Sequence, residues 1–177
     1  MGAAIGRRLG FLSGGARSVL QAGAVLGGRF TVEDLALVSG RTVAGLAPIV
    51  EEAVAAGVLA EAGSELMFRH ALIRQALHDG LPVAVRVGLH AHVARAFADA
   101  GASWDRVARH LLAAPQAISG WVLTWLAGLP ASALYAQPGI AAELLDHARR
   151  VCLPGDRAAG VVHRPAVHGA AAAAAPR

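Results

Sequence analysis

The sequence predicts a mainly α-helical fold with one small β-hairpin, and helices lie both before and after that hairpin. Three observations carry this prediction. Apolar residues recur at helical spacing along most of the chain, capping residues and glycines separate these stretches, and alanine dominates the apolar residues. Hydrophobic residues make up 55% of the 177 residues, which is enough to bury a core. The scarcity of tyrosine and phenylalanine argues against a β-sandwich.

Three helices are expected before the hairpin, because a capping residue precedes each of three stretches with helical spacing. The caps are Ser13, Thr31 and Thr42. Glycines follow the three stretches: Gly27, Gly40 and Gly57. Asp34 lies three residues after Thr31 and completes a capping box. Pro48 is expected to kink the third helix or delay its start, and Arg29 with Phe30 is expected to form a short link.

Two short strand-like pieces, 58–61 and 66–69, flank a turn at 62–65 and predict the hairpin. A helix from His70 or Ala71 to about Leu81 follows directly. Three helices followed by a hairpin is the order of a winged helix-turn-helix. The expected organisation is therefore an N-terminal link at 1–12 and a winged-helix domain at 13–81.

The rest of the chain predicts packed helix pairs. Leu89, Val93 and Phe97 lie four apart, and Ser103 caps a helix that carries Trp104, Val107, Leu111 and Leu112. One buried helix face is expected at Ile118, Trp121, Val122, Trp125 and Leu126. A last helix follows Pro138 and Gly139. We therefore expect an α-solenoid-like (TPR-like) helical-repeat region at 82–152 and a disordered Ala/Pro/Gly-rich tail at 153–177.

Several kinds of chemistry are missing from the sequence. All 16 basic residues are arginine, so a phosphate-binding P-loop, which needs lysine, is excluded. The single cysteine, Cys152, allows no intramolecular disulfide and fits a reducing cytoplasm. His90 and His92 point to different faces of a helix, and other histidines could join them only through tertiary contacts: His70, His78 and His110. The serines lie at caps and turns. We therefore expect no enzyme activity and no metal site.

A net charge of +4 invites a nucleic-acid interpretation, but the arginines are spread along the chain. The third helix would be the recognition helix of a DNA-binding winged helix. It carries Glu51 and Glu52 and no arginine after Arg41, and acidic side chains there oppose phosphate contact. Only Arg69 supports a DNA-binding wing. The sequence therefore favours a winged helix used for protein contact.

The stretch 68–77, Phe-Arg-His-Ala-Leu-Ile-Arg-Gln-Ala-Leu, followed by Leu81 and Pro82, resembles the winged-helix end of large ATP-binding LuxR-type STAND transcriptional regulators. These are signal-transduction ATPases with a regulatory helical region. Residues 24–30 resemble the first helix of the same module. Residues 89–97 and 107–112 resemble the helices that open its repeat region.

The resemblance implies a non-catalytic relay segment of such a regulator, without the ATPase domain or the C-terminal DNA-binding helix-turn-helix. Its implied partner is the nucleotide-binding domain of the same or a related protein, with self-association as a further expectation. DNA is contacted only through a missing domain, no membrane is involved, and the location is cytoplasmic. The chain needs no cofactor itself, whereas ATP or ADP serves the full-length family. His70 matches a histidine that touches the β-phosphate of ADP in related proteins.

Two alternatives stay open at this point. The chain could be a stand-alone winged-helix DNA-binding transcription factor whose later helices dimerise. It could also be a module of another multidomain STAND ATPase. The domains that would distinguish these alternatives are absent from the sequence.

Overall fold

The computed structural model describes Gly10 and residues 12–152 of the chain. This part is mainly helical and contains one small three-stranded antiparallel sheet. The expected tail, and all of the expected N-terminal link except Gly10 and Leu12, lie outside the described residues. In chain order the elements are α2 (Gly14–Leu26), β1 (Arg29–Phe30), α3 (Val32–Ser39), α4 (Val43–Ala55), β2 (Leu59–Ala62), β3 (Glu65–Phe68), α5 (Ala71–Asp79), α6 (Val83–Asp99), α7 (Trp104–Ala113), a 3-10 turn (Pro115–Ala117), α8 (Gly120–Ala127), α9 (Ala131–Ala136) and α10 (Pro138–Cys152).

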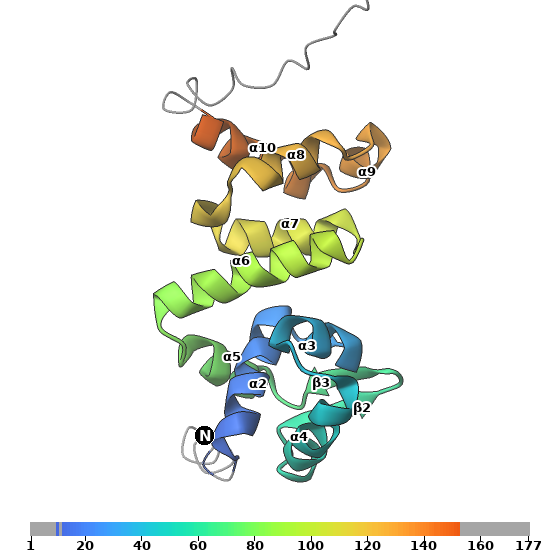
Figure 1. Cartoon of the computed structure of the whole chain (residues 1–177), viewed down its shortest axis with the longest axis vertical. Coiled ribbons are helices and arrows are strands. Elements are labelled where there is room, and N and C mark those ends of the chain that lie inside the picture. Colours follow the sequence, from blue (N-terminus) through green and yellow to red (C-terminus); the bar gives the residue numbers. More distant parts are fainter. Residues whose placement is uncertain (1–9, 11, 153–177) are drawn as a thin grey trace, which may run out of the picture.

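Figure 1 shows these elements in three tiers along the long axis of the molecule. The lower tier holds α2 to α5 and the sheet, the middle tier holds the α6–α7 pair, and the upper tier holds α8 to α10. Among the helices that the structure describes, none is long and apolar enough to cross a membrane.

The expected helix caps are confirmed in the lower tier. Ser13, Thr31 and Thr42 each accept, through the side-chain oxygen, a hydrogen bond from the backbone N–H three residues later. Asp34 returns a hydrogen bond to the backbone N–H of Thr31, so the capping box is complete. Gly40 ends α3 with a left-handed φ of 65°, a conformation that costs a residue with a Cβ atom free energy. Local chemistry therefore sets the starts of α2, α3 and α4.

Pro48 does not delay the start of α4, contrary to one part of the expectation. The helix begins at Val43, where the side chain of Thr42 caps its first turn. Pro48 lies on the exposed side of α4. It has no N–H to donate to the carbonyl one turn earlier, but water can reach this side of the helix. The cap by Thr42 starts the helix despite the proline six residues later.

The sheet has one strand more than the sequence predicts. Arg29 and Phe30, expected as a link, form β1, which pairs antiparallel with β3 so that the strand order is β1-β3-β2. The ring of Phe30 is buried, 5.8 Å from the ring of Phe68. A two-residue strand leaves no alternation in the sequence, and only the pairing with β3 reveals it. The hairpin itself is confirmed, with β2 starting one residue later and β3 one residue earlier than expected.

The upper tier departs most from the prediction. Ile118 precedes α8 instead of lying in it, and within α8 only Val122 is buried. Trp121, Trp125 and Leu126 are half-buried, so the expected single buried face is wrong in part. α8 is a short outer helix, and its neighbours cover less apolar surface than its sequence offers. α9 is a six-residue helix that the sequence does not predict, whereas α10 follows the expected boundary at Pro138.

Two apolar cores hold the described tiers together. The first lies within the lower tier, where α2, α3, α4 and α5 pack on the sheet, and includes Leu20, Leu35, Leu46, Phe30, Phe68, Ile73 and Leu77. The second joins α2 and α3 to the tiers above, and includes Ala22, Val25, Val38, Val93, Phe97, Leu111 and Leu144. Helix α2 contributes residues to both cores. It therefore fixes the lower tier against α6 and α7.

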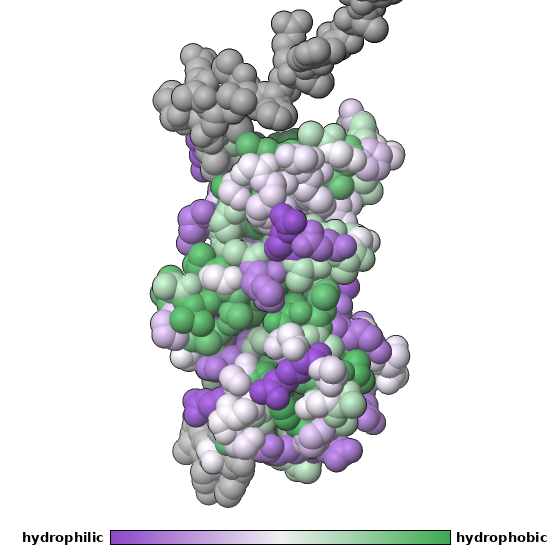
Figure 2. All heavy atoms as spheres, viewed as in Figure 1, coloured by the Kyte–Doolittle hydropathy of each residue, from purple (hydrophilic) through white to green (hydrophobic). Residues whose placement is uncertain are grey.

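Apolar side chains also remain on the surface. In Figure 2 hydrophobic residues gather on the left of the visible face, at the level where α5 leads into α6. Val83 and Val85, at the start of α6, are 65% and 47% exposed.

Candidate functional site

Three histidines from different helices meet near the contact of the lower and middle tiers. His78 comes from the last turn of α5, His90 from α6, and His110 from the last turn of α7. The ring centroids of His78 and His90 are 5.8 Å apart, and those of His90 and His110 are 5.3 Å apart. The ring of Phe97 lies 5.6 Å from that of His110 in an edge-to-face arrangement. The fold thus makes the tertiary contact among histidines that sequence spacing alone does not give.

His90 and His110 share a hydrogen bond between ring nitrogens. Their Nδ1 atoms are 3.0 Å apart, so one ring donates its Nδ1–H and the other accepts at a bare Nδ1. Protonation of both rings would break this bond, because neither would keep an acceptor. His110 is a buried polar residue, with 7% of its surface exposed.

Burial lowers the pKa of both rings. The pKa of His110 falls from 6.5 to about 4, mainly through desolvation, and the nearby charges of His90, Arg106 and Arg109 act in the same direction. The pKa of His90 also falls to about 4, first through desolvation and then through His78 and Arg86. Both imidazoles are therefore neutral near pH 7.

A salt bridge beside this pair ties the lower tier to the middle tier. Nη2 of Arg106 on α7 donates to Oδ2 of Asp34 on α3 at 2.8 Å. The same carboxylate completes the capping box of α3, so one residue starts a helix and holds two tiers. The guanidinium carbon of Arg106 lies 4.2 Å from the centroid of the Phe97 ring, a cation–π contact. Polar and aromatic groups thus run without a break from α3 to the histidines.

The outer end of this array is charged. Nδ1 of His78 and Oδ1 of Asp79 are 3.0 Å apart, and an Arg86 nitrogen lies 3.7 Å from the same oxygen. The hydrogen bond to His78 is the largest cause that lowers the pKa of Asp79. The connection between α5 and α6 therefore carries its own group of charges.

A cavity of about 420 Å³ opens between the tiers next to the histidine pair. The lower tier contributes residues 25–29, from the end of α2 into β1. The middle tier contributes His90 and Phe97 from α6 and Arg106, Arg109 and His110 from α7. Three arginines thus line the cavity, and no acidic side chain does so among the described residues.

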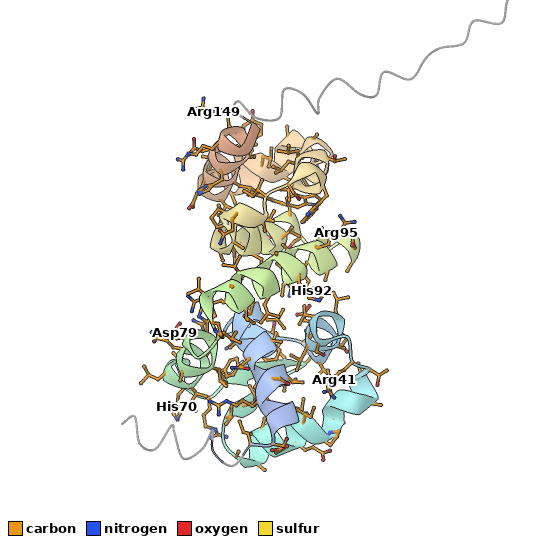
Figure 3. All side chains as sticks on the ribbon, turned by 60° about the vertical axis from the view of Figure 1, so that its left-hand side comes forward. Arg41, His70, Asp79, His92, Arg95 and Arg149 are labelled. Atoms are coloured by element: carbon orange, nitrogen blue, oxygen red, sulfur yellow. The ribbon has the colours of Figure 1, made fainter. Side chains whose placement is uncertain are left out.

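His70, the site residue implied by the resemblance, lies away from this junction. It occupies the N-cap position of α5, directly after β3, as the sequence predicts. Its side chain is exposed and makes no capping hydrogen bond. In Figure 3 His70 and Asp79 lie at opposite ends of α5, and Asp79 is the one beside α6. The fold brings His78, His90 and His110 together and leaves His70 out.

In the described part of the chain, no group of three or more His, Cys, Asp or Glu side chains is arranged to hold an ion. His92 is exposed, whereas His90 turns inward to His110. The expectation that these two histidines face differently is confirmed.

Sequence reasoning missed Arg106, Arg109 and Asp34 as members of a site, and it did not single out His110. One signal was present: His110 falls at helical spacing among Val107, Leu111 and Ala114, which are all buried. A polar residue on an apolar helix face predicts a buried partner. The salt bridge between Asp34 and Arg106 joins residues 72 apart in the chain and leaves no comparable signal.

Comparisons with protein families, with curated protein sequences and with solved structures each found no match.

Proposed function

We propose that this chain is a non-catalytic relay segment of an ATP-dependent LuxR-type STAND transcriptional regulator, in which a winged-helix unit couples a nucleotide-binding domain to helical repeats. Its partner is that nucleotide-binding domain, and the chain contacts DNA only through another domain. The proposal rests on the residues that carry the resemblance and on the surface chemistry described below.

The order of elements supports a winged helix in the lower tier. Helix, short strand, two helices and a hairpin follow one another, and the short first strand pairs with the last strand of the hairpin. The antiparallel α6–α7 pair and the helices above it support the start of a helical repeat.

The main support for a protein-binding role is the composition of the exposed surface of α4. Its exposed positions include Val43, Ala47, Pro48 and Glu51, and the helix has no basic residue. Glu52 is occupied within the fold, because its carboxylate accepts hydrogen bonds from the backbone N–H and the hydroxyl of Ser13, at 2.7 and 3.1 Å. A helix with this surface offers small apolar contacts and a negative charge to its partner. DNA phosphates would meet repulsion there.

The junction described above supports the relay role. The salt bridge between Asp34 and Arg106 links α3, which precedes α4, to α7 in the middle tier. A displacement of the lower tier by a partner would therefore pull on α7 directly. The imidazole of His70 is exposed at the start of α5, which leaves it accessible to a nucleotide bound by the partner domain.

DNA binding across a salt series separates this proposal from the stand-alone transcription factor. The full chain and a Glu51→Arg variant are titrated with random duplex DNA and with duplex from the region upstream of the coding sequence. We expect weak binding to both duplexes, with an increase in Glu51→Arg because a cation replaces an exposed carboxylate. Tight, sequence-selective binding by the unmodified chain would refute the relay proposal and favour the alternative that Arg69 supports.

A further inference from the structure

We infer that the cavity between α2, α6 and α7 is a binding site for a small oxyanion, a ligand that carries phosphate or carboxylate groups. This inference goes beyond the relay role and requires neither a nucleotide-binding domain nor DNA. It rests on the chemistry of the cavity wall and on how the arginines of that wall are held.

The wall selects anions. Arg29, Arg106 and Arg109 line the cavity, and their carboxylate partners Glu65, Asp34 and Asp105 are not among the lining residues. A guanidinium carries five N–H donors in a planar fork, a geometry that fits carboxylate and phosphate oxygens. A cationic ligand would be repelled by the three guanidinium groups, and an apolar ligand would cover polar groups without bonding them.

The arginines keep donors for a ligand. The Arg29–Glu65 contact is 3.7 Å, which is beyond a normal hydrogen bond. The Arg109–Asp105 contact on α7 is 3.1 Å, but it engages one guanidinium nitrogen and leaves the Arg109 side chain 63% exposed. Arg106 is the most firmly held, with one nitrogen on Asp34 and its plane near Phe97. Arg106 is therefore fixed, whereas the mostly exposed guanidinium groups of Arg29 and Arg109 keep N–H donors for an incoming anion.

The histidine pair couples anion binding to proton uptake. An anion beside His90 and His110 would favour the imidazolium form and offset part of the desolvation that keeps both rings neutral. The titratable and cationic groups that act on the pair are His78 from α5, Arg86 from α6, and Arg106 and Arg109 from α7. Ligand binding should therefore be accompanied by proton uptake, and the affinity should rise as the pH falls from 7 toward 5.5.

The site spans two tiers, which gives binding a structural effect. Arg29 belongs to β1 in the lower tier, whereas Arg106 and Arg109 belong to α7 in the middle tier. An anion held by both sides would bridge the tiers and resist their separation. The bound chain should unfold at a higher temperature than the free chain.

Isothermal titration calorimetry of the full chain, with inorganic phosphate, pyrophosphate and citrate as probes, tests the site. We expect saturable binding of at least one probe, and the preferred probe distinguishes phosphate from carboxylate chemistry. Arg109→Gln and Arg29→Gln should each weaken binding about tenfold, because each removes a charge-assisted hydrogen bond. Titration in two buffers of different ionisation enthalpy should reveal the proton uptake.

Arg150→Gln is the matched control. Arg150 pairs with Asp146 four residues earlier on α10, as Arg109 pairs with Asp105 on α7. The Arg150 side chain is 66% exposed against 63% for Arg109, and it does not line the cavity. Affinity should stay unchanged in this variant. Absence of saturable binding for all three probes would overturn the inference. Equal weakening by Arg150→Gln and Arg109→Gln would overturn it as well, because binding would then reflect general charge. Neither result bears on the DNA titration that tests the relay proposal.

Discussion

Acidification from pH 7 to pH 4.5 should destabilise the chain, and His110 should account for a large part of the loss. His110 has a pKa of about 4 in the folded chain against 6.5 for an unperturbed histidine. Between these values the unfolded chain binds more protons than the folded chain. The stability that the chain gains from keeping His110 neutral is therefore fully present above pH 6.5 and is lost as the pH falls toward 4.

The magnitude follows from the pKa difference. Each pKa unit corresponds to about 1.4 kcal/mol, so the shift of His110 makes a difference of about 3.5 kcal/mol well below pH 4 and about 2.5 kcal/mol at pH 4.5. His90 acts in the same direction but is only half-buried, so solvent screening reduces its share.

Urea unfolding followed by tryptophan fluorescence at pH 7, 6, 5 and 4.5 measures this loss. In His110→Leu the free energy of unfolding should fall by about 2.5 kcal/mol less over this range than in the unmodified chain. His92→Gln, which removes an exposed histidine from α6, should follow the unmodified chain. Carboxylates that protonate over the same range affect all three proteins and cancel in the comparison. Parallel pH profiles for the unmodified chain and His110→Leu would refute the assignment of a neutral, buried His110.

Three further predictions concern the junction, the backbone and the nucleotide. Asp34→Asn should lower the free energy of unfolding by about 1–2 kcal/mol because it removes the charge that holds Arg106, whereas Asp99→Asn, in an exposed pair, should cost less than about 0.5 kcal/mol; equal urea midpoints would contradict this. Gly88→Ala should stabilise α6 by up to about 1 kcal/mol, because an added Cβ meets no atom within 4 Å. Gly40→Ala should destabilise the chain by about 1 kcal/mol, because the φ angle at this position is +65°. Melting temperatures that move in the same direction in the two variants would refute these two predictions. In a longer regulator that joins this segment to a nucleotide-binding domain, His70→Ala should speed ADP release severalfold, and unchanged ADP retention would remove the proposed role of His70.

Local chemistry made the lower tier predictable. The starts of α2, α3 and α4 depend on a side chain and a backbone N–H three residues apart, and such contacts are visible in the sequence. The hairpin was likewise predictable, because Gly63 and Ser64 separate two short apolar stretches. β1 was not, since its two residues are strand only through pairing with β3, whose partner residues lie almost 40 positions later.

The site could be predicted only in part, for the same reason. Helical spacing places His110 on a buried face, but nothing in the sequence identifies His90 on another helix as its partner. The three arginines of the cavity lie on β1 and α7, and their common position depends on how α2 packs between the two cores. His70 is the reverse case: its place at the start of α5 was predictable from sequence, yet its imidazole has no capping role in the fold.

The histidine pair is a costly way to join α6 to α7, and that cost points to a role beyond packing. Val93, Val107 and Leu111 already bring the two helices together through apolar contacts. An apolar residue at position 110 would add to that packing without a desolvation penalty or a need for a hydrogen-bond partner. The polar pair instead lines a cavity together with arginines, next to the salt bridge that links α3 to α7. Because the same groups hold the tiers together and face the cavity, a proton or an anion that enters there must change the stability of the contact between the tiers.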